Sequence, residues 1–163
     1  MLIGILSDSH GRCKAVRRAV ALFDRLGAGM IIHCGDVGDL GVLDEMAGRN
    51  CRFVWGNMDE PSSAVDAHLE TLGIPPPDHQ GLSIDVDGKH ILVFHGHEPT
   101  FRRAIHEQAA DYVLHGHTHQ PCNRRVGAVR VVNPGALHRA KPRTVATLDT
   151  ATDDVTFYDI DSP

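Results

Sequence analysis

The sequence predicts an α/β fold in which two sheets of mixed direction pack together and helices cover the outside. Two observations predict it. Short apolar runs alternate with helical stretches through the first third of the chain, which is typical of strand-helix-strand units with parallel strands. Later apolar runs are joined by short turns, which favour antiparallel pairs. We expect a single domain over residues 1–163, because this length leaves no room for a linker between two.

The first third is expected to alternate strands and helices. Its apolar runs are short and bounded by glycine and polar residues, as in buried strands. Val16, Ala19, Val20, Phe23 and Leu26 recur at helical spacing and predict an amphipathic helix. The expected elements are a strand at 2–6, a helix at 15–26, a strand at 30–34, a helix at 40–47 and a strand at 51–55.

The remainder is expected to contain two further helices and several antiparallel pairs. Segment 74–78 must be a loop, because consecutive prolines cannot donate hydrogen bonds to a helix or a sheet; we interpret it as a connection and not as a domain boundary. Asp87-Gly88 predicts a hairpin turn. The expected elements are a helix at 63–72, strands at 82–86 and 90–94, a helix at 100–109, a strand at 112–114, a strand pair at 124–126 and 129–132, and a strand pair at 144–148 and 155–160.

The composition, 42% hydrophobic and 23% charged, is that of a soluble globular protein. No apolar run approaches the roughly 20 residues of a transmembrane helix, and the opening segment reaches Asp8 too soon for a signal peptide. We therefore expect a cytoplasmic protein that binds no membrane. The cysteines show no C-x-x-C spacing, so we expect reduced, mostly buried thiols and neither a zinc ribbon nor a disulfide framework. They are Cys13, Cys34, Cys51 and Cys122.

The net charge of −5 comes entirely from the C-terminal end. Residues 144–163 contain five aspartates and no Lys or Arg, so residues 1–143 balance at 16 basic against 16 acidic residues. This balance argues against a nucleic-acid-binding protein, and no extended nucleic-acid groove is evident.

Five expected strands end in a glycine beside a side chain that can bind a metal. The five segments are Asp8-Ser9-His10-Gly11, Gly35-Asp36, Gly56-Asn57, His95-Gly96-His97 and Gly116-His117-Thr118-His119. Because the carboxyl ends of neighbouring parallel strands line one crevice, we expect these segments to converge. Residues two apart on an extended chain point the same way, so each of the pairs Asp8/His10 and His117/His119 is expected to present two ligands to one face.

Each of these segments taken singly has a simpler interpretation. An isolated Asp-x-His is commonly a helix cap, and an isolated Gly-Asp or Gly-Asn is usually a turn. We interpret His33, His115 and His138 first as packed or hydrogen-bonded residues. The other histidines outside the segments, His68, His79, His90 and His106, are expected at the surface or in loops. Seven candidate ligands at five strand ends are nevertheless more than chance predicts.

The candidate ligands constrain the metal. Imidazole with carboxylate and without thiolate suits Mn²⁺, Fe, Co²⁺, Ni²⁺ or Zn²⁺. Seven side chains are too many for one ion, but two ions that share a carboxylate would use them, and we expect Asp36 to be the bridge. Other metal-hydrolase patterns do not fit: a TIM barrel needs at least about 200 residues, and the residues after His119 do not continue a metallo-β-lactamase motif.

The ordered set Asp8-x-His10, Gly35-Asp36-x-x-Asp39, Gly56-Asn57, His95 and Gly116-His117-x-His119 resembles the calcineurin-like metallophosphoesterase superfamily. The small size and Asn133-Pro134-Gly135-Ala136 resemble its small bacterial and archaeal phosphodiesterase branch. The resemblance implies a four-layer α/β/β/α sandwich with two divalent transition metal ions, Mn²⁺ being expected before Fe, Ni²⁺, Co²⁺ or Zn²⁺. It implies one ion at Asp8, His10, Asp36 and His119, and a second at Asp36, Asn57, His95 and His117.

The expected activity is hydrolysis of a small phosphorylated substrate, with diesters preferred by the resemblance. A hydroxide that bridges the metals would attack phosphorus in line.

Many members of the superfamily carry a histidine after Gly-Asn, whereas Met58 and Asp59 follow Gly56-Asn57 here. His97 is therefore our candidate general acid, and Asp59 is a weaker candidate. We interpret Arg12, Arg102 and Arg103 first as surface residues.

The alternative function is that of a metal-poor scaffold or protein-interaction module on the same fold. Such a protein would be expected to have lost some of the metal ligands. A homo-oligomer is compatible with the sequence.

Overall fold

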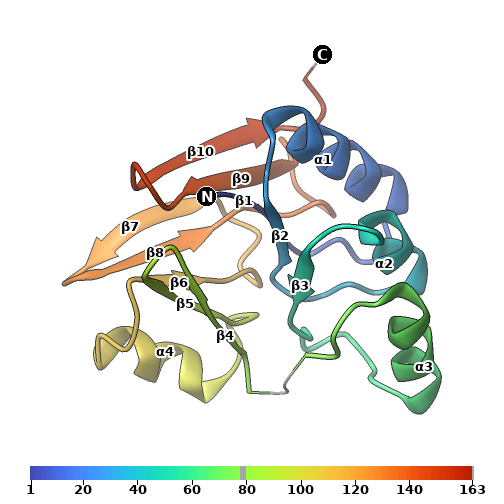
Figure 1. Ribbon diagram of the computed structural model, residues 1–163, viewed down its shortest axis with the longest axis horizontal. Coiled ribbons are helices and arrows are strands. Elements are labelled where there is room, and N and C mark those ends of the chain that lie inside the picture. The colour runs from blue at the N-terminus through green and yellow to red at the C-terminus, as the bar shows by residue number, and fades with distance from the viewer. Residues whose placement is uncertain (78–79, 163) are drawn as a thin grey trace.

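The computed structural model describes residues 1–77 and 80–162 and arranges them in two five-stranded sheets with four helices (Figure 1). The strands are β1 (Leu2–Leu6), β2 (Met30–His33), β3 (Cys51–Phe53), β4 (Leu82–Val86), β5 (Lys89–Val93), β6 (Tyr112–Leu114), β7 (Cys122–Val126), β8 (Val129–Asn133), β9 (Thr144–Asp149) and β10 (Asp154–Asp159). The helices are α1 (Cys13–Leu26), α2 (Leu40–Met46), α3 (Ser63–Leu72) and α4 (Pro99–His106).

Both sheets are mixed, as the sequence predicts. The first has the order β10-β9-β1-β2-β3, in which β1, β2 and β3 run parallel and β9 pairs antiparallel with both β1 and β10. The second has the order β4-β5-β6-β8-β7, in which β5, β6 and β8 run parallel and the edge strands are antiparallel. The two predicted C-terminal pairs therefore lie in different sheets.

Three hydrophobic clusters separate four layers. One, which includes Val16 and Phe53, lies between helices α1 to α3 and the first sheet. A second, which includes Ile5 and Val93, lies between the two sheets. The third joins α4 to the outer face of the second sheet through Ala104 and Val131. This is the predicted α/β/β/α sandwich, and Figure 1 shows α4 on the side opposite α1.

The expected elements all occur, with bounds that agree or differ by one to three residues. The helix predicted to end at 109 ends at His106, because the backbone turns left-handed at Gln108 (φ 55°). Residues 74–77 of the predicted proline loop are irregular, whereas position 78 and the expected surface residue His79 lie outside the described residues. Cys34 and Cys51 are buried, but Cys13 and Cys122 are only partly buried, so the prediction of mostly buried thiols holds for two of the four.

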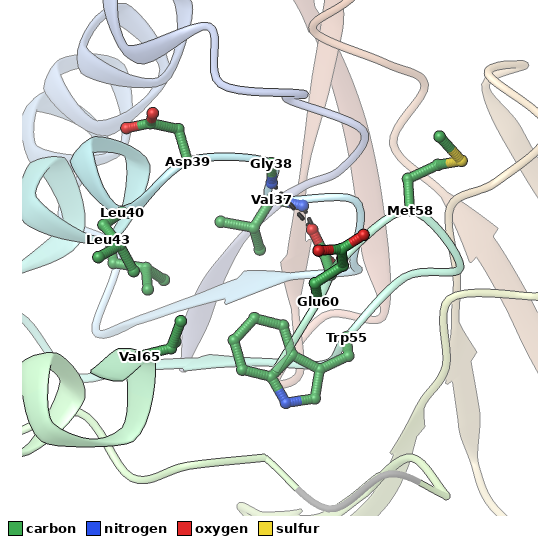
Figure 2. Close-up of a pocket in the computed structure, with 10 residues that line it drawn as sticks. Val37, Gly38, Asp39, Leu40, Leu43, Trp55, Met58, Glu60 and Val65 are labelled. Atoms are coloured by element: carbon green, nitrogen blue, oxygen red, sulfur yellow. Dashed lines mark hydrogen bonds between the residues drawn. The ribbon is translucent and has the colours of Figure 1, made fainter. Parts of the chain in front are cut away.

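The topology places the functional segments at one edge of the sandwich. Strands β1, β2 and β3 end together in the first sheet, and β5 and β6 end together in the second. A cavity lies where α2 and α3 meet the segments that follow β2 and β3 (Figure 2).

Within the described ranges, no helix combines the length and apolar character needed to cross a bilayer.

Candidate metal centre

The candidate ligands lie on strained turns just beyond the strand ends. Five of them have a left-handed backbone, which is uncommon for residues other than glycine and clusters at functional sites. They are Asp8 (φ 53°), His10 (φ 42°), Asp36 (φ 55°), His117 (φ 67°) and His119 (φ 59°). We expected Asp8/His10 and His117/His119 each to share a face because the chain would be extended there. That reason is wrong, because all four residues have a left-handed backbone. The strands stop at Leu6 and Leu114, and tight turns bring the side chains together.

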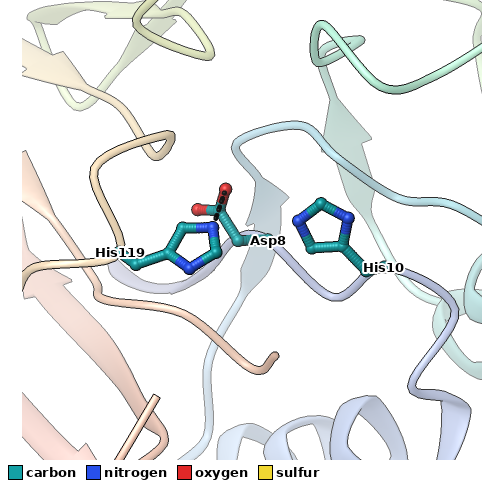
Figure 3. A group of neighbouring side chains, drawn as sticks. All are labelled: Asp8, His10 and His119. Carbon is teal, nitrogen blue, oxygen red and sulfur yellow. Dashed lines mark ion pairs between the residues drawn. The ribbon is translucent and has the colours of Figure 1, made fainter. Parts of the chain in front are cut away.

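Asp8 is fully buried and joins two groups of possible ligands. It lies with His10 and His119 in one group and with Asp36 and His95 in the other, and the ligand atoms within each group lie within 4.8 Å of one another. His119 Nε2 is 3.2 Å from Asp8 Oδ1 (Figure 3). The shared carboxylate links the first strand end with residues contributed from both sheets.

Asp36 belongs to the second group and also contacts a member of the first. Its Oδ2 lies 3.3 Å from His10 Nε2 and 3.4 Å from His95 Nε2. Burial alone would raise the pKa of Asp36, but the hydrogen bond with His95, the Met58 N–H and the nearby imidazoles lower it to about 2. Asp36 is therefore an anion at neutral pH that contacts one imidazole from each predicted ligand set.

His95 has one ring nitrogen fixed and the other directed at oxygen acceptors. Its Nδ1 lies 2.8 Å from the Cys34 carbonyl, an acceptor only, so Nδ1 must donate the proton. Its Nε2 lies 3.1 Å from Asn57 Oδ1 and 3.4 Å from Asp36 Oδ2. A neutral imidazole would face these oxygens with a lone pair, so the arrangement favours a cation or an additional proton between them. This donor set fits a divalent metal ion.

The other two predicted site residues, His117 and His97, lie close to His95. The His117 ring centroid is 5.0 Å from that of His95, and the His117 N–H donates to Asp8 Oδ2 at 3.1 Å. The His97 ring is 5.5 Å from His95 and 6.2 Å from His117, and its side chain is 39% exposed. The chain turns at Gly96 (φ 120°), so it is this turn, and not an extended strand, that places His97 beside the ligand cluster.

Two glycines beside the ligands lie where there is no room for a side chain. A Cβ at Gly56 would collide with the Asp36 carboxylate, and one at Gly116 would collide with Ser7 Oγ. Both positions bring the backbone close to a buried polar group, which is the reason that the sequence places glycine there.

Two carboxylates hold the site's loops in a way that the sequence did not predict: Asp59, which was named only as a weaker candidate acid, and Glu98, which was not named. Asp59 accepts hydrogen bonds from the N–H groups of Val37, Gly38 and Gly56, at 3.1, 2.9 and 2.8 Å. It therefore fastens the loop that carries Asp36, and both of its carboxylate oxygens are engaged as acceptors. Buried Glu98 accepts from the N–H groups of His95 and Gly96, both at 2.7 Å. Neither role has a local sequence signal, because both depend on contacts across loops.

His33 and His115 are buried and hydrogen-bonded, as predicted. The Gly35 N–H donates to His33 Nδ1, and His33 Nε2 lies 2.8 Å from Ser9 Oγ, so this ring joins the loops after β1 and β2. Burial lowers the pKa of His33 to about 3 and that of His115 to about 4. Both rings are therefore neutral at pH 7 and support the ligand loops without adding charge.

The metal-free protein should lose stability as the pH falls below about 6.5. The unfolded chain protonates His33 and His115 near 6.5, whereas the folded chain resists protonation to about 3 and 4, so unfolding gains protons in this window. Each group contributes about 1.4 kcal/mol per pH unit, or about 2 kcal/mol between pH 6.5 and 5. Urea unfolding of wild type and His115→Gln would measure this: the variant should be less stable at pH 7 but show a shallower pH dependence. Equal slopes would contradict the assignment.

His138 lies beside the His10 imidazole and is hydrogen-bonded to Arg12. The Arg12 Nε–H donates to His138 Nδ1 at 3.1 Å, and the His138 ring is 4.9 Å from that of His10. Arg12 makes no ion pair with a carboxylate anywhere in residues 1–77 and 80–162. Its positive charge at the rim of the site is therefore not compensated by a paired carboxylate among the described residues.

Comparisons with known proteins point to one superfamily. The sequence model of the calcineurin-like phosphoesterase superfamily domain matches residues 1–153. The chain is 30% identical over 138 residues to phosphodiesterase MJ0936 of Methanocaldococcus jannaschii, a match that covers 83% of each chain. It is 29% identical over 170 residues to phosphodiesterase YfcE of Escherichia coli, which covers 91% of this chain and 88% of the relative. A solved structure described as a novel archaeal phosphodiesterase superposes with a TM-score of 0.85 at 28% identity, over 97% of this chain and 99% of that one.

Proposed function

The chain belongs to the calcineurin-like phosphoesterase superfamily, and we propose that it is a metal-dependent phosphodiesterase with a two-metal centre. The first ion would be held by Asp8, His10, Asp36 and His119, and the second by Asp36, Asn57, His95 and His117. The observation that carries the proposal is the position of Asp36 Oδ2, within 3.4 Å of an imidazole nitrogen from each ligand set.

The donor set decides which metals fit. Imidazole and carboxylate groups surround the site, and none of the four free cysteines belongs to the ligand groups. These donors suit Mn²⁺, Fe, Co²⁺, Ni²⁺ or Zn²⁺, of which we propose Mn²⁺. When bound, a pair of such ions lowers the pKa of water for attack on phosphorus and neutralises charge on the phosphate oxygens.

The chain's own residues then bind and orient the substrate. Arg12, held by His138 and without a carboxylate partner, is positioned to bind a phosphate oxygen at the rim beside His10. His97 is the candidate that donates a proton to the leaving oxygen, because it is partly exposed and lies beside His95 and His117. His33 and Asp59 hold the ligand loops in place.

Metal analysis of the purified chain, combined with a substrate panel, tests this function. We expect about two transition metal ions per chain after loading, as a two-metal hydrolase requires. We also expect hydrolysis of bis(p-nitrophenyl) phosphate that a chelator abolishes and Mn²⁺ restores, with lower rates on phosphomonoesters. A chain that binds one ion or none, or that hydrolyses the diester equally well after chelation, would contradict the proposal. A chain that binds no metal and cleaves no ester would favour the scaffold alternative.

A further inference from the structure

A cavity of about 230 Å³ adjoins the candidate metal centre and takes no part in the reaction described above. Its walls are mainly apolar and include Leu40, Leu43, Trp55 and Val65, and we call it the Trp55 cavity (Figure 2). Pockets for drug-sized ligands measure about 300–1,000 Å³. The Trp55 cavity is smaller, so it suits one small group in preference to a nucleoside.

The Trp55 cavity and the metal centre share a wall. Val37 follows the ligand Asp36 directly and Met58 follows the ligand Asn57 directly, and both line the cavity. The Met58 N–H donates to Asp36 Oδ1 at 3.0 Å. Because adjacent Cα atoms lie about 3.8 Å apart, the lining of the cavity begins one residue from two of the predicted ligands, and we infer that the alcohol group of a phosphate ester bound at the metal centre faces the cavity.

The charge of the lining selects against a second phosphate. The described residues that line the cavity include three acids, Asp39, Asp59 and Glu60, and no basic residue. Asp59 accepts three backbone N–H groups, and Asp39 caps α2 by accepting from the Gly41 N–H at 2.7 Å. Glu60 forms no hydrogen bond or ion pair within residues 1–77 and 80–162. Its carboxylate therefore remains available to attract a cation.

The aromatic wall is suited to the same kind of ligand. Trp55 is half-buried, and its ring packs edge-to-face against Phe53 with centroids 4.7 Å apart. An indole face is the strongest cation–π partner among the side chains. The apolar side chains of the lining contact methyl groups more favourably than ammonium N–H groups, which favours a cation whose nitrogen carries methyl groups.

We propose that the Trp55 cavity binds the quaternary ammonium group of a choline-type alcohol, so that phosphodiesters of such an alcohol are the preferred substrates. The proposal rests on the proposed phosphodiesterase function for the reaction. The binding of the alcohol group itself depends only on the cavity and can be measured without metal.

Trp55 is the only tryptophan of the chain, so intrinsic fluorescence reports on the cavity. Metal-free protein would be titrated with choline, with its uncharged isostere 3,3-dimethylbutan-1-ol and with ethanolamine. We expect a saturable fluorescence change with choline and a Kd about tenfold lower than for 3,3-dimethylbutan-1-ol or ethanolamine.

Glu60→Gln should reduce the preference for choline severalfold. Glu70→Gln, the same change at an exposed position on α3, should leave it unchanged. Equal binding of choline and the isostere, tight binding of ethanolamine, or an unaltered preference in Glu60→Gln would overturn the proposal.

Hydrolysis by the Mn²⁺-loaded enzyme provides the second measurement. Glu60→Gln should lower kcat/KM for p-nitrophenylphosphorylcholine about tenfold and leave that for bis(p-nitrophenyl) phosphate unchanged, since only the first carries a cation. If the enzyme cleaves bis(p-nitrophenyl) phosphate but choline leaves Trp55 fluorescence unchanged, the cavity proposal fails and the function stands. If choline binds but no diester is cleaved, the proposed function fails instead.

Discussion

Replacing Asp36 by asparagine is expected to lower kcat/KM for a phosphodiester by about 10³-fold while the protein remains folded. The Asp36 carboxylate lies between His10 and His95 and would hold both metal ions. Asparagine removes the charge and one metal-binding oxygen. Charge stabilisation by metal ions contributes several kcal/mol, and each 1.4 kcal/mol corresponds to a factor of ten in rate. The hydrogen bond from the Met58 N–H survives, because the amide retains an oxygen at this position.

Steady-state kinetics with Mn²⁺, metal content and thermal unfolding of the same preparations would measure the effect. Asp44→Asn is a matched control, since it makes the same chemical change at an exposed position of α2 where the side chain pairs with His68. It should keep wild-type activity. Near wild-type turnover of Asp36→Asn with Mn²⁺ supplied would require the two-metal proposal to be abandoned.

Much of the fold follows from hydrophobic patterning. Apolar runs such as residues 2–6 and 112–114 have no polar interruption, because these strands are covered on both sides by the core between the sheets and by the helices. The Asp87-Gly88 turn is local chemistry, since both residues adopt a left-handed backbone. The order of strands in the sheets was not predictable in this way. The pairing of β9 with β1, for example, joins residues more than 140 positions apart.

The candidate site was predictable as a set of residues but not as a geometry. Glycine beside Asp, Asn or His marks each strand end, and parallel strands bring such ends together. Asp8 and His10 were expected to share a face of an extended chain, whereas both residues lie in left-handed turns. The supporting contacts of Asp59 and Glu98 and the walls of the Trp55 cavity come from separate loops and helices. They have no fixed spacing by which one sequence could reveal them.

The strained backbone at the ligands has a physical explanation in the proposed function. Left-handed non-glycine residues cost on the order of 1–3 kcal/mol each, and the surrounding structure must enforce them. Here the His33 ring, the Asp59 carboxylate and the His117 N–H bond to Asp8 fix the turns from outside. They hold Asp36 Oδ2, which is buried, and Asn57 Oδ1 within 3.4 Å of His95 Nε2, so that three lone-pair donors face one another, which is unfavourable for the protein alone and favourable around a cation. A metal ion would therefore stabilise the turns that bind it.

His97→Ala is expected to affect poor leaving groups selectively. Met58, which follows Gly56-Asn57, is 64% exposed, and its thioether cannot donate a proton. Positioned acid catalysis contributes about 10² to 10⁴ in rate, and it matters most when the departing oxygen is an alkoxide. The variant should therefore lose about 10²-fold or more on alkyl phosphodiesters. It should lose little on p-nitrophenyl esters, whose nitrophenolate leaves without a proton.

A series of aryl and alkyl diesters, compared between wild type, His97→Ala and His106→Ala, would measure this selectivity. His106 is an exposed histidine at the end of α4, so its replacement makes the same chemical change away from the ligand cluster and should leave the series unaltered. A steeper dependence of rate on leaving-group pKa in His97→Ala alone would identify His97 as the acid. Equal losses across the series would instead indicate that His97 acts on binding or on the orientation of His95, with the proton supplied by water. Because His97 lies 5.5 Å from the His95 ring, such an indirect effect would lower every rate by a similar factor, and the slope of the series separates the two roles.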